Sequence, residues 1–209
     1  MKLFLASYSP CANEVLGKTF LSLLNKPVNK KRLLILAMDT TSDFYSKYLE
    51  IDRQWYIKQG FQGKNIDILN LNSDNIPSFE DIDVLHIWGG NTFHYLKRIR
   101  ELNLIPRIRE FVDRDGVYVR TSAGSELMCP DLDVNLTSDV NDIGLTDLMC
   151  LGYVDFNIVP HWDSFLSIGA EVNLMDFMRY IWKTGKQVIP ITDNQAILVL
   201  DDEVKIISP

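Results

Sequence analysis

The sequence predicts an α/β fold with a mainly parallel central sheet flanked by helices. Short apolar runs alternate along the chain with longer segments whose apolar residues recur at helical spacing, and this alternation is typical of parallel sheets covered by helices. Residues 33–38 form a continuous apolar run, as expected for a strand that is buried on both faces. The chain has 209 residues, 46% of them hydrophobic, which is enough for one large core. It contains no internal repeat or linker, so we expect a single domain over residues 1–209.

Predicted strands and helices follow one another up to residue 121. The strands, each a short apolar run, are residues 3–6, 33–38, 66–71, 84–88 and 117–119. The helices are indicated by apolar residues at helical spacing, which are Leu16, Phe20, Leu23 and Leu24, then Tyr45, Tyr48, Leu49 and Trp55, then Leu96, Ile99 and Leu102, and finally Ile108, Phe111 and Val112. Ser42 is expected to cap the second of these helices, because its hydroxyl can accept a hydrogen bond from a free N–H of the first turn.

The pattern changes after Pro130. Residues 131–147 are rich in Asp, Asn, Thr and Ser and predict a long polar loop. A strand is expected at residues 153–159, ending at Pro160-His161-Trp162-Asp163, and a helix at residues 174–181 that ends near Gly185. Two apolar runs, residues 196–200 and 204–207, predict a terminal hairpin.

Composition excludes several classes of protein. The net charge of −7 argues against a surface for nucleic acid or for an anionic membrane. The three cysteines include no Cys-x-x-Cys pair, which argues against a zinc or redox motif and favours a reducing compartment. The apolar run at the N-terminus stops at Ala6, too short for a signal peptide, and no run is long enough for a membrane helix. We expect a cytoplasmic protein, a monomer or homodimer, with neither nucleic acid nor membrane as partner.

A candidate nucleophile stands at the end of the strand at residues 117–119. The strand runs directly into Ser122-Ala123-Gly124, and a helix is expected to follow. This layout suits a nucleophile elbow, in which a serine hydroxyl is exposed on a tight turn at the end of a sheet.

A serine needs a base to accept its proton, and the chain has three histidines. His86 alternates with apolar neighbours inside a strand and is expected to be structural. His94 begins a helix, where an exposed or capping role is expected. His161 follows a strand and a proline in a polar context, and it is the best candidate for the base.

The acid that would orient His161 is left open among three residues. Asp139 and Asp142 lie in the polar loop, and Asp163 lies two residues from His161, on the same side if the backbone there is extended.

Donors for a developing oxyanion are also indicated. The N–H of Ala123 follows the serine, and the Gly89-Gly90 pair can bring a second backbone N–H close. Gly-x-Gly-x-x-Gly, a P-loop and His-Glu-x-x-His are all absent, so nucleotide binding has only weak support from the sequence.

These residues together resemble the dipeptidase E and cyanophycinase family of serine peptidases. Four segments, in the order expected, carry the resemblance over nearly the whole chain, and they are Trp88-Gly89-Gly90-Asn91-Thr92-Phe93, Ser122-Ala123-Gly124-Ser125 with Cys129-Pro130, Thr137-Ser138-Asp139 and Asn157-Ile158-Val159-Pro160-His161. The resemblance implies a three-layer sandwich like that of class I glutamine amidotransferases. It also implies cleavage of peptides with a preference for aspartate, since dipeptidase E removes an N-terminal Asp and cyanophycinase cuts Asp-Arg polymers.

The resemblance implies a role for each matching residue. Ser122 becomes the nucleophile, His161 the general base and Asp139 the acid that orients it. Gly90 and Ala123 become the oxyanion donors, with Gly89 beside them, and Asn91 shapes the loop or contacts substrate. The resemblance implies no metal or organic cofactor.

Arg120 departs from the family, which usually has glycine two positions before the serine. An inward-facing Arg120 would bind a substrate carboxylate, since guanidinium suits bidentate carboxylate recognition, and an outward-facing one would have no such role.

The leading hypothesis is a serine exopeptidase that hydrolyses short peptides, Asp-X dipeptides among them, through an acyl-enzyme. Two alternatives stay open. One is a non-catalytic binding or regulatory protein on the same fold, and the other is a hydrolase of a different amide or ester.

Overall fold

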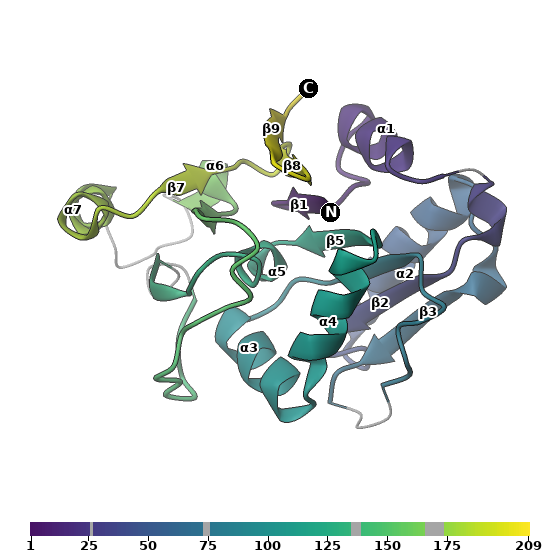
Figure 1. The fold of residues 1–209 in the computed structure, drawn as a ribbon, viewed down its shortest axis with the longest axis horizontal. Helices are drawn as coiled ribbons and strands as arrows, with labels where there is room; N and C mark the ends of the chain where they lie inside the picture. The colour runs from purple at the N-terminus through teal and green to yellow at the C-terminus, as the bar shows by residue number, and fades with distance from the viewer. Residues whose placement is uncertain (26, 73–75, 135–138, 166–173) are drawn as a thin grey trace.

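The protein is described by a computed structural model in which residues 1–25, 27–72, 76–134, 139–165 and 174–209 are placed (Figure 1). Its centre is a seven-stranded sheet in which β8 and β9 run antiparallel to their neighbours and every other pairing is parallel. In order across the sheet the strands are β3 (Ile66–Asn70), β2 (Leu33–Ala37), β4 (Val84–Ile87), β5 (Val117–Thr121), β1 (Lys2–Ala6), β8 (Ala196–Leu200) and β9 (Glu203–Ile207). The predicted α/β fold with a mainly parallel sheet is therefore confirmed.

Helices cover the two faces of the sheet. The helices are α1 (Glu14–Ser22), α2 (Asp43–Lys58), α3 (Thr92–Glu101), α4 (Leu104–Asp113), α5 (Ala123–Glu126), α6 (Trp162–Phe165) and α7 (Leu174–Thr184), with short 3₁₀ turns at Val28–Lys30 and Gly63–Asn65. As predicted, the hydroxyl of Ser42 caps α2 by accepting from the N–H of Tyr45.

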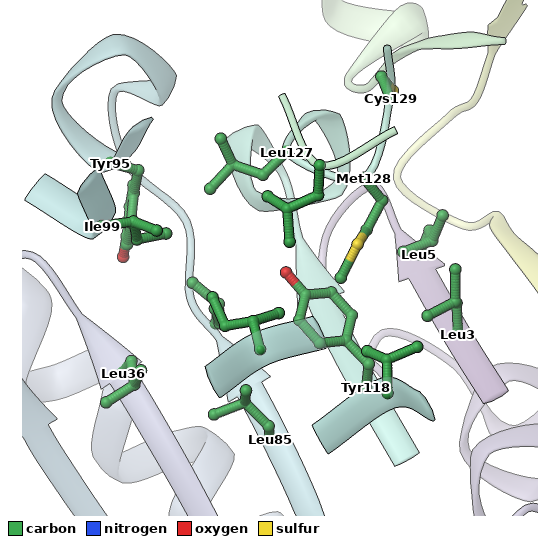
Figure 2. Packing of buried hydrophobic residues seen from close by; sticks show 14 of the residues in the cluster. Leu3, Leu5, Leu36, Leu85, Tyr95, Ile99, Tyr118, Leu127, Met128 and Cys129 are labelled. Atoms are coloured by element: carbon green, nitrogen blue, oxygen red, sulfur yellow. The ribbon is translucent and has the colours of Figure 1, made fainter. Parts of the chain in front are cut away.

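Alternate residues of the strands face two separate hydrophobic clusters. Phe4, Ile35 and Val119 pack with α1 and α2 on one face, whereas Leu5 and Tyr118 pack with α3, α4 and the turn after α5 on the other. Figure 2 shows this second cluster, with Tyr118 from β5 pointing toward Leu127 and Met128. The period of two along each strand thus divides the molecule into three layers.

The segment after Pro130 differs in part from the sequence-based expectation. The strand expected at residues 153–159 is limited to β6 (Asn157–Val159), because the N–H groups of Tyr153 and Val154 donate to the carbonyl of Met128 instead of to a neighbouring strand. β6 pairs in parallel with β7 (Val188–Pro190), which the sequence analysis did not identify, in a small second sheet.

Parallel pairing brings several strand ends to one edge of the main sheet. Ala6 at the end of β1 is in register with Thr121 at the end of β5, and Ile87 at the end of β4 is in register with Arg120. The residues that come next in the chain therefore meet, as expected where the carboxyl ends of parallel strands form a site. Within the placed part of the chain, no helix is both long and apolar enough to span a bilayer.

Candidate active site

Ser122 occupies a tight turn between β5 and α5. Its backbone has φ 53° and ψ −132°, a conformation that a residue with a side chain rarely adopts and that costs on the order of 1–3 kcal/mol. The turn is held by its N–H, which is shared between the carbonyls of Ala6 (3.1 Å) and Ser7 (2.9 Å) at the end of β1. The layout of strand, strained serine and helix is that of a nucleophile elbow.

His161 lies directly against this serine. It follows β6 and Pro160, has a positive φ of 56°, and its N–H donates to the hydroxyl of Ser7 at 2.7 Å. Its ring Nε2 is 2.8 Å from Ser122 Oγ. The structure thus brings together the nucleophile and base candidates, which are separated by 39 positions in the chain.

The carboxylate on the other ring nitrogen belongs to Asp193. Its Oδ1 lies 2.6 Å from His161 Nδ1 and also accepts from Ser7 Oγ at 2.8 Å. Since a carboxylate can only accept, we assign the proton of the neutral imidazole to Nδ1, which leaves Nε2 free to accept from the Ser122 hydroxyl. Asp193 therefore occupies the orienting position that an acid needs to hold the histidine in the required tautomer.

The expectation that Asp139 orients His161 is wrong. The side chain of Asp139 contacts the first residue of α3, Thr92. Its Oδ2 accepts from the N–H of Thr92 (2.8 Å) and from the Thr92 hydroxyl (2.7 Å). Both ring nitrogens of His161 already have partners, Ser122 and Asp193. Of the segment matched around Asp139, residues 137 and 138 lie outside the described residues.

The other two acid candidates have different partners as well. Asp142 pairs with His94 Nε2 at 2.6 Å on the surface. Asp163, at the start of α6, accepts from the backbone N–H of Asp193 at 3.3 Å. Asp163 therefore supports the loop that carries the carboxylate partner of His161.

Ser7 and Asp193 were missed by the sequence analysis. Ser7 directly follows β1, and Asp193 lies three residues after β7. A position directly after a predicted strand could have pointed to Ser7. No such signal existed for Asp193, because the sequence did not predict β7.

The Gly89-Gly90-Asn91 segment adjoins the elbow. A Cβ on Gly89 would lie 3.3 Å from Ser122 Cβ, and Gly90 has φ 146°, so glycine permits both the close approach and the turn. Asn91 caps α3, its Oδ1 accepting from the N–H groups of Phe93 and His94, while its Nδ2 donates to the carbonyl of Val140. Asn91 thus shapes the loop, one of the two roles expected of it.

Arg120 neither projects into the pocket nor faces outward, which corrects both readings of its role. Its side chain is fully buried on the face of β5 that carries Tyr118. The guanidinium lies 5.5 Å from the ring centre of Tyr95 and 5.9 Å from that of Tyr118, and none of its nitrogens has a hydrogen-bond partner among the placed residues. Burial lowers the pKa of Arg120 from its ordinary value. A carboxylate-binding role for this residue is therefore abandoned.

A cavity of about 360 Å³ opens beside Ser122 and His161. Its lining residues come from the ends of β1, β4, β5 and β6 and from α2, and they are Tyr8, Ser9, Cys11, Phe44, Tyr45, Tyr48, Ile51, Asp52, Trp88, Gly89, Gly90, Thr121, Ser122 and His161. Burial is the main cause that raises the pKa of the Cys11 thiol to about 11, so this thiol is neutral at physiological pH. In the described ranges, no three His, Cys, Asp or Glu side chains are grouped so that they could hold a metal ion.

Comparison with known proteins identifies the family and the fold. Residues 3–207 match the model of peptidase family S51. An uncharacterised peptidase of Pasteurella multocida is 30% identical over 152 residues, covering 70% of this chain and 71% of its own length. A peptidase E of Shewanella sp. (strain ANA-3) is 25% identical over 202 residues, covering 87% and 83%.

Solved structures share the fold. A peptidase E candidate from Listeria monocytogenes EGD-e superposes with a TM-score of 0.75 at 21% identity, covering 98% of this chain and 96% of its own. A peptidase from an acI-B1 Actinobacterium gives a TM-score of 0.74 at 14% identity, covering 100% and 87%. At such identities the likeness concerns the fold alone, but the family model spans nearly the whole sequence. The chain belongs to peptidase family S51 and is a serine peptidase.

Proposed function

We propose that this protein is a serine exopeptidase that hydrolyses short peptides through an acyl-enzyme, with Ser122, His161 and Asp193 as its triad. The observation that carries the proposal is the continuous contact from Asp193 Oδ1 to His161 Nδ1 (2.6 Å) and from His161 Nε2 to Ser122 Oγ (2.8 Å). A serine hydroxyl becomes nucleophilic when a base accepts its proton, and this arrangement supplies both the base and the group that orients it.

The reaction has two halves. Ser122 Oγ attacks the scissile carbonyl carbon while its proton passes to His161 Nε2, and Asp193 stabilises the imidazolium that forms. The C–N bond then breaks as His161 protonates the leaving amine. In the second half a water molecule, losing its proton to His161, attacks the acyl group, and the acid product leaves as Ser122 recovers its proton.

The backbone N–H groups of Ala123 and Gly90 are our candidates for the oxyanion donors. Ala123 begins α5, so its N–H is one of those that have no partner inside the helix. Gly90 directly follows Gly89, whose backbone lies so close to Ser122 that an added Cβ would touch the Ser122 side chain. Loss of one such donor typically lowers kcat by about 10²–10³-fold.

Preference for Asp-X dipeptides is the finer activity that the resemblance implies. The residues that line the cavity in the described part of the chain include neither Lys nor Arg, and Arg120 is buried elsewhere. We therefore propose hydrolysis of short peptides without tying it to aspartate, and a screen of Asp-Leu against Ala-Leu measures the preference directly.

Replacement of the nucleophile tests the proposal. Ser122→Ala removes the attacking oxygen and should lower kcat for a dipeptide mixture by about 10⁴–10⁶-fold with an unchanged melting curve. Ser22→Ala, at the exposed end of α1, is the matched control and should keep full activity. A fluorophosphonate probe should label the wild type and the control but not Ser122→Ala. Equal turnover by Ser122→Ala and the wild type would exclude the mechanism.

A further inference from the structure

The cavity beside Ser122 combines a buried carboxylate with a wall of aromatic rings. The aromatic lining comes from the loop after β1, from α2 and from the end of β4, and it consists of Tyr8, Phe44, Tyr45, Tyr48 and Trp88. Asp52, on the same helix α2, also lines the cavity although only 4% of its surface is exposed. A charged side chain is rarely buried to this degree without a partner of opposite charge.

Each donor to Asp52 is a neutral group. Oδ1 accepts from Ser9 Oγ at 2.8 Å and from Cys11 Sγ at 3.3 Å, and Oδ2 accepts from Trp88 Nε1 at 2.8 Å. No ion pair joins Asp52 to a Lys, Arg or His within the described ranges. Two carboxylate oxygens have about four lone-pair positions, so Oδ2 retains capacity for one more donor.

Asp52 is the only carboxylate on the described wall of the cavity, and the other acidic groups close to it stay neutral. Burial, together with the charge of Asp52, raises the pKa of both the Tyr8 hydroxyl and the Cys11 thiol, so neither ionises at physiological pH. The cavity therefore offers one negative charge that three neutral donors only partly compensate.

The aromatic rings near Asp52 also favour the binding of a cation. Tyr45 and Trp88 contact each other edge to face at 5.5 Å between ring centres, and Phe44 packs against both Tyr45 and Tyr48. The faces of such rings carry partial negative charge and attract ammonium groups, while their apolar area accepts the attached alkyl chain.

We propose that this cavity binds an alkylammonium group of the peptide substrate, with the ammonium facing Asp52 and its carbon chain against the aromatic wall. The proposal rests on the proposed peptidase function, because the cavity is shared with Ser122 and His161. The ammonium has two possible sources in a peptide, the free N-terminus and a lysine side chain. A substrate aspartate placed here would meet the charge of Asp52, so this enzyme should disfavour aspartate in the cavity.

The test compares peptides that differ by one ammonium group. Lysine peptides are compared with norleucine peptides, in which a hydrogen atom replaces the ammonium group, and Ala-Leu is compared with propionyl-Leu, which lacks only the α-amine. In the wild type, kcat/KM should be at least about tenfold higher for the ammonium-bearing member of one pair, as expected for a hydrogen bond to a charged group. The pair that shows the difference identifies the source of the ammonium.

Asp52→Asn should bring that ratio close to one, because it removes the negative charge that the ammonium group faces. Asparagine keeps the size of the side chain, and the Ser9 hydroxyl can reverse its direction to accept from the new amide. Glu50→Gln removes the same charge from an exposed position on α2, outside the cavity, and should keep the wild-type ratio. Equal ratios in the wild type and Asp52→Asn would overturn the proposal, as would a wild-type preference for Asp-Leu over Ala-Leu.

Binding separates this proposal from the catalytic one. Calorimetry with the Ser122→Ala protein measures the dissociation constants of the same peptide pairs without turnover. Tighter binding of the ammonium member supports the site even if no peptide is cleaved by the wild type, an outcome that would refute the peptidase proposal alone. Equal binding of both members of each pair refutes the site. If Asp52→Asn does not fold, as judged by circular dichroism, the comparisons on wild-type and Ser122→Ala proteins still decide.

Discussion

The assignment of Asp193 as the orienting acid makes a prediction that differs sharply from one based on Asp139. In Asp193→Asn the amide NH₂ would face His161 Nδ1 at the 2.6 Å position now held by Oδ1. The imidazole would then place its proton on Nε2, the atom that has to accept from Ser122 Oγ. A histidine in this tautomer cannot act as the base.

The expected loss of kcat is about 10⁴-fold, corresponding to a rise in the activation barrier of about 5 kcal/mol. The fold should survive, because asparagine keeps the size of aspartate and its NH₂ has two N–H groups, one for His161 Nδ1 and one for the Ser7 hydroxyl, which now donates to Oδ1 at 2.8 Å and can turn to accept instead. A continuous assay of dipeptide hydrolysis measures kcat, and the rate of fluorophosphonate labelling should fall in parallel because it depends on the same activated serine.

Asp139→Asn is the matched control, since it makes the same chemical change at the acid that the sequence favoured. Its carboxylate contacts Thr92 at the start of α3, so kcat should stay within about threefold of the wild type. Full activity in Asp193→Asn combined with a loss of several hundredfold in Asp139→Asn would refute the assignment and restore Asp139 as the orienting acid.

Two further predictions concern stability. A Cβ on Gly124 would collide with the buried guanidinium of Arg120, so Gly124→Ala should lower the free energy of unfolding in urea by about 1–2 kcal/mol. Arg120→Met, which removes an unpaired buried charge, should raise it by about 1–3 kcal/mol and should reduce the cost of Gly124→Ala in the double variant; strictly additive effects would contradict this contact. The pKa of His86 is lowered from 6.5 to about 4, mainly because burial disfavours the charged imidazolium. The unfolded chain therefore binds this proton at higher pH than the folded chain does, and a stabilisation of up to about 3 kcal/mol, complete above about pH 6.5, is lost as the pH falls toward 4. Urea titrations across that window should show a smaller pH dependence in His86→Gln than in the wild type, and an equal dependence would count against the assignment to His86.

The main strands and helices could be predicted because their signals are local. The continuous apolar run at residues 33–38 became β2, every residue of which is buried, and the spacing of Ile108, Phe111 and Val112 became the buried face of α4. β7 was not predicted, because it has only three residues and ends in a proline. A pairing of this length depends on the partner strand β6, which lies elsewhere in the sequence.

The residues of the candidate site were likewise predicted only in part. Ser122 and His161 were found because each follows a predicted strand and belongs to a recognisable motif. The orienting acid, Asp193, was not found, because the chain has many aspartates. Only the position of a carboxylate in space decides which one becomes the partner of His161. Asp163 illustrates the difficulty: it lies two residues from His161 but supports the backbone of Asp193 instead of the imidazole.

By itself, the sequence determined the α/β fold, the family, the serine elbow and the histidine that faces it, since all of these depend on local patterns and short motifs. Only the tertiary structure decided which acid meets that histidine, where the guanidinium of Arg120 lies and which side chains line the cavity. These three outcomes depend on contacts between segments far apart in the chain, such as the 32 positions between His161 and Asp193. The orientation of Arg120 has a simple physical cause: side chains alternate along a strand, so a residue on the same face of β5 as Tyr118 packs with the core behind the elbow and cannot reach the cavity in front of it.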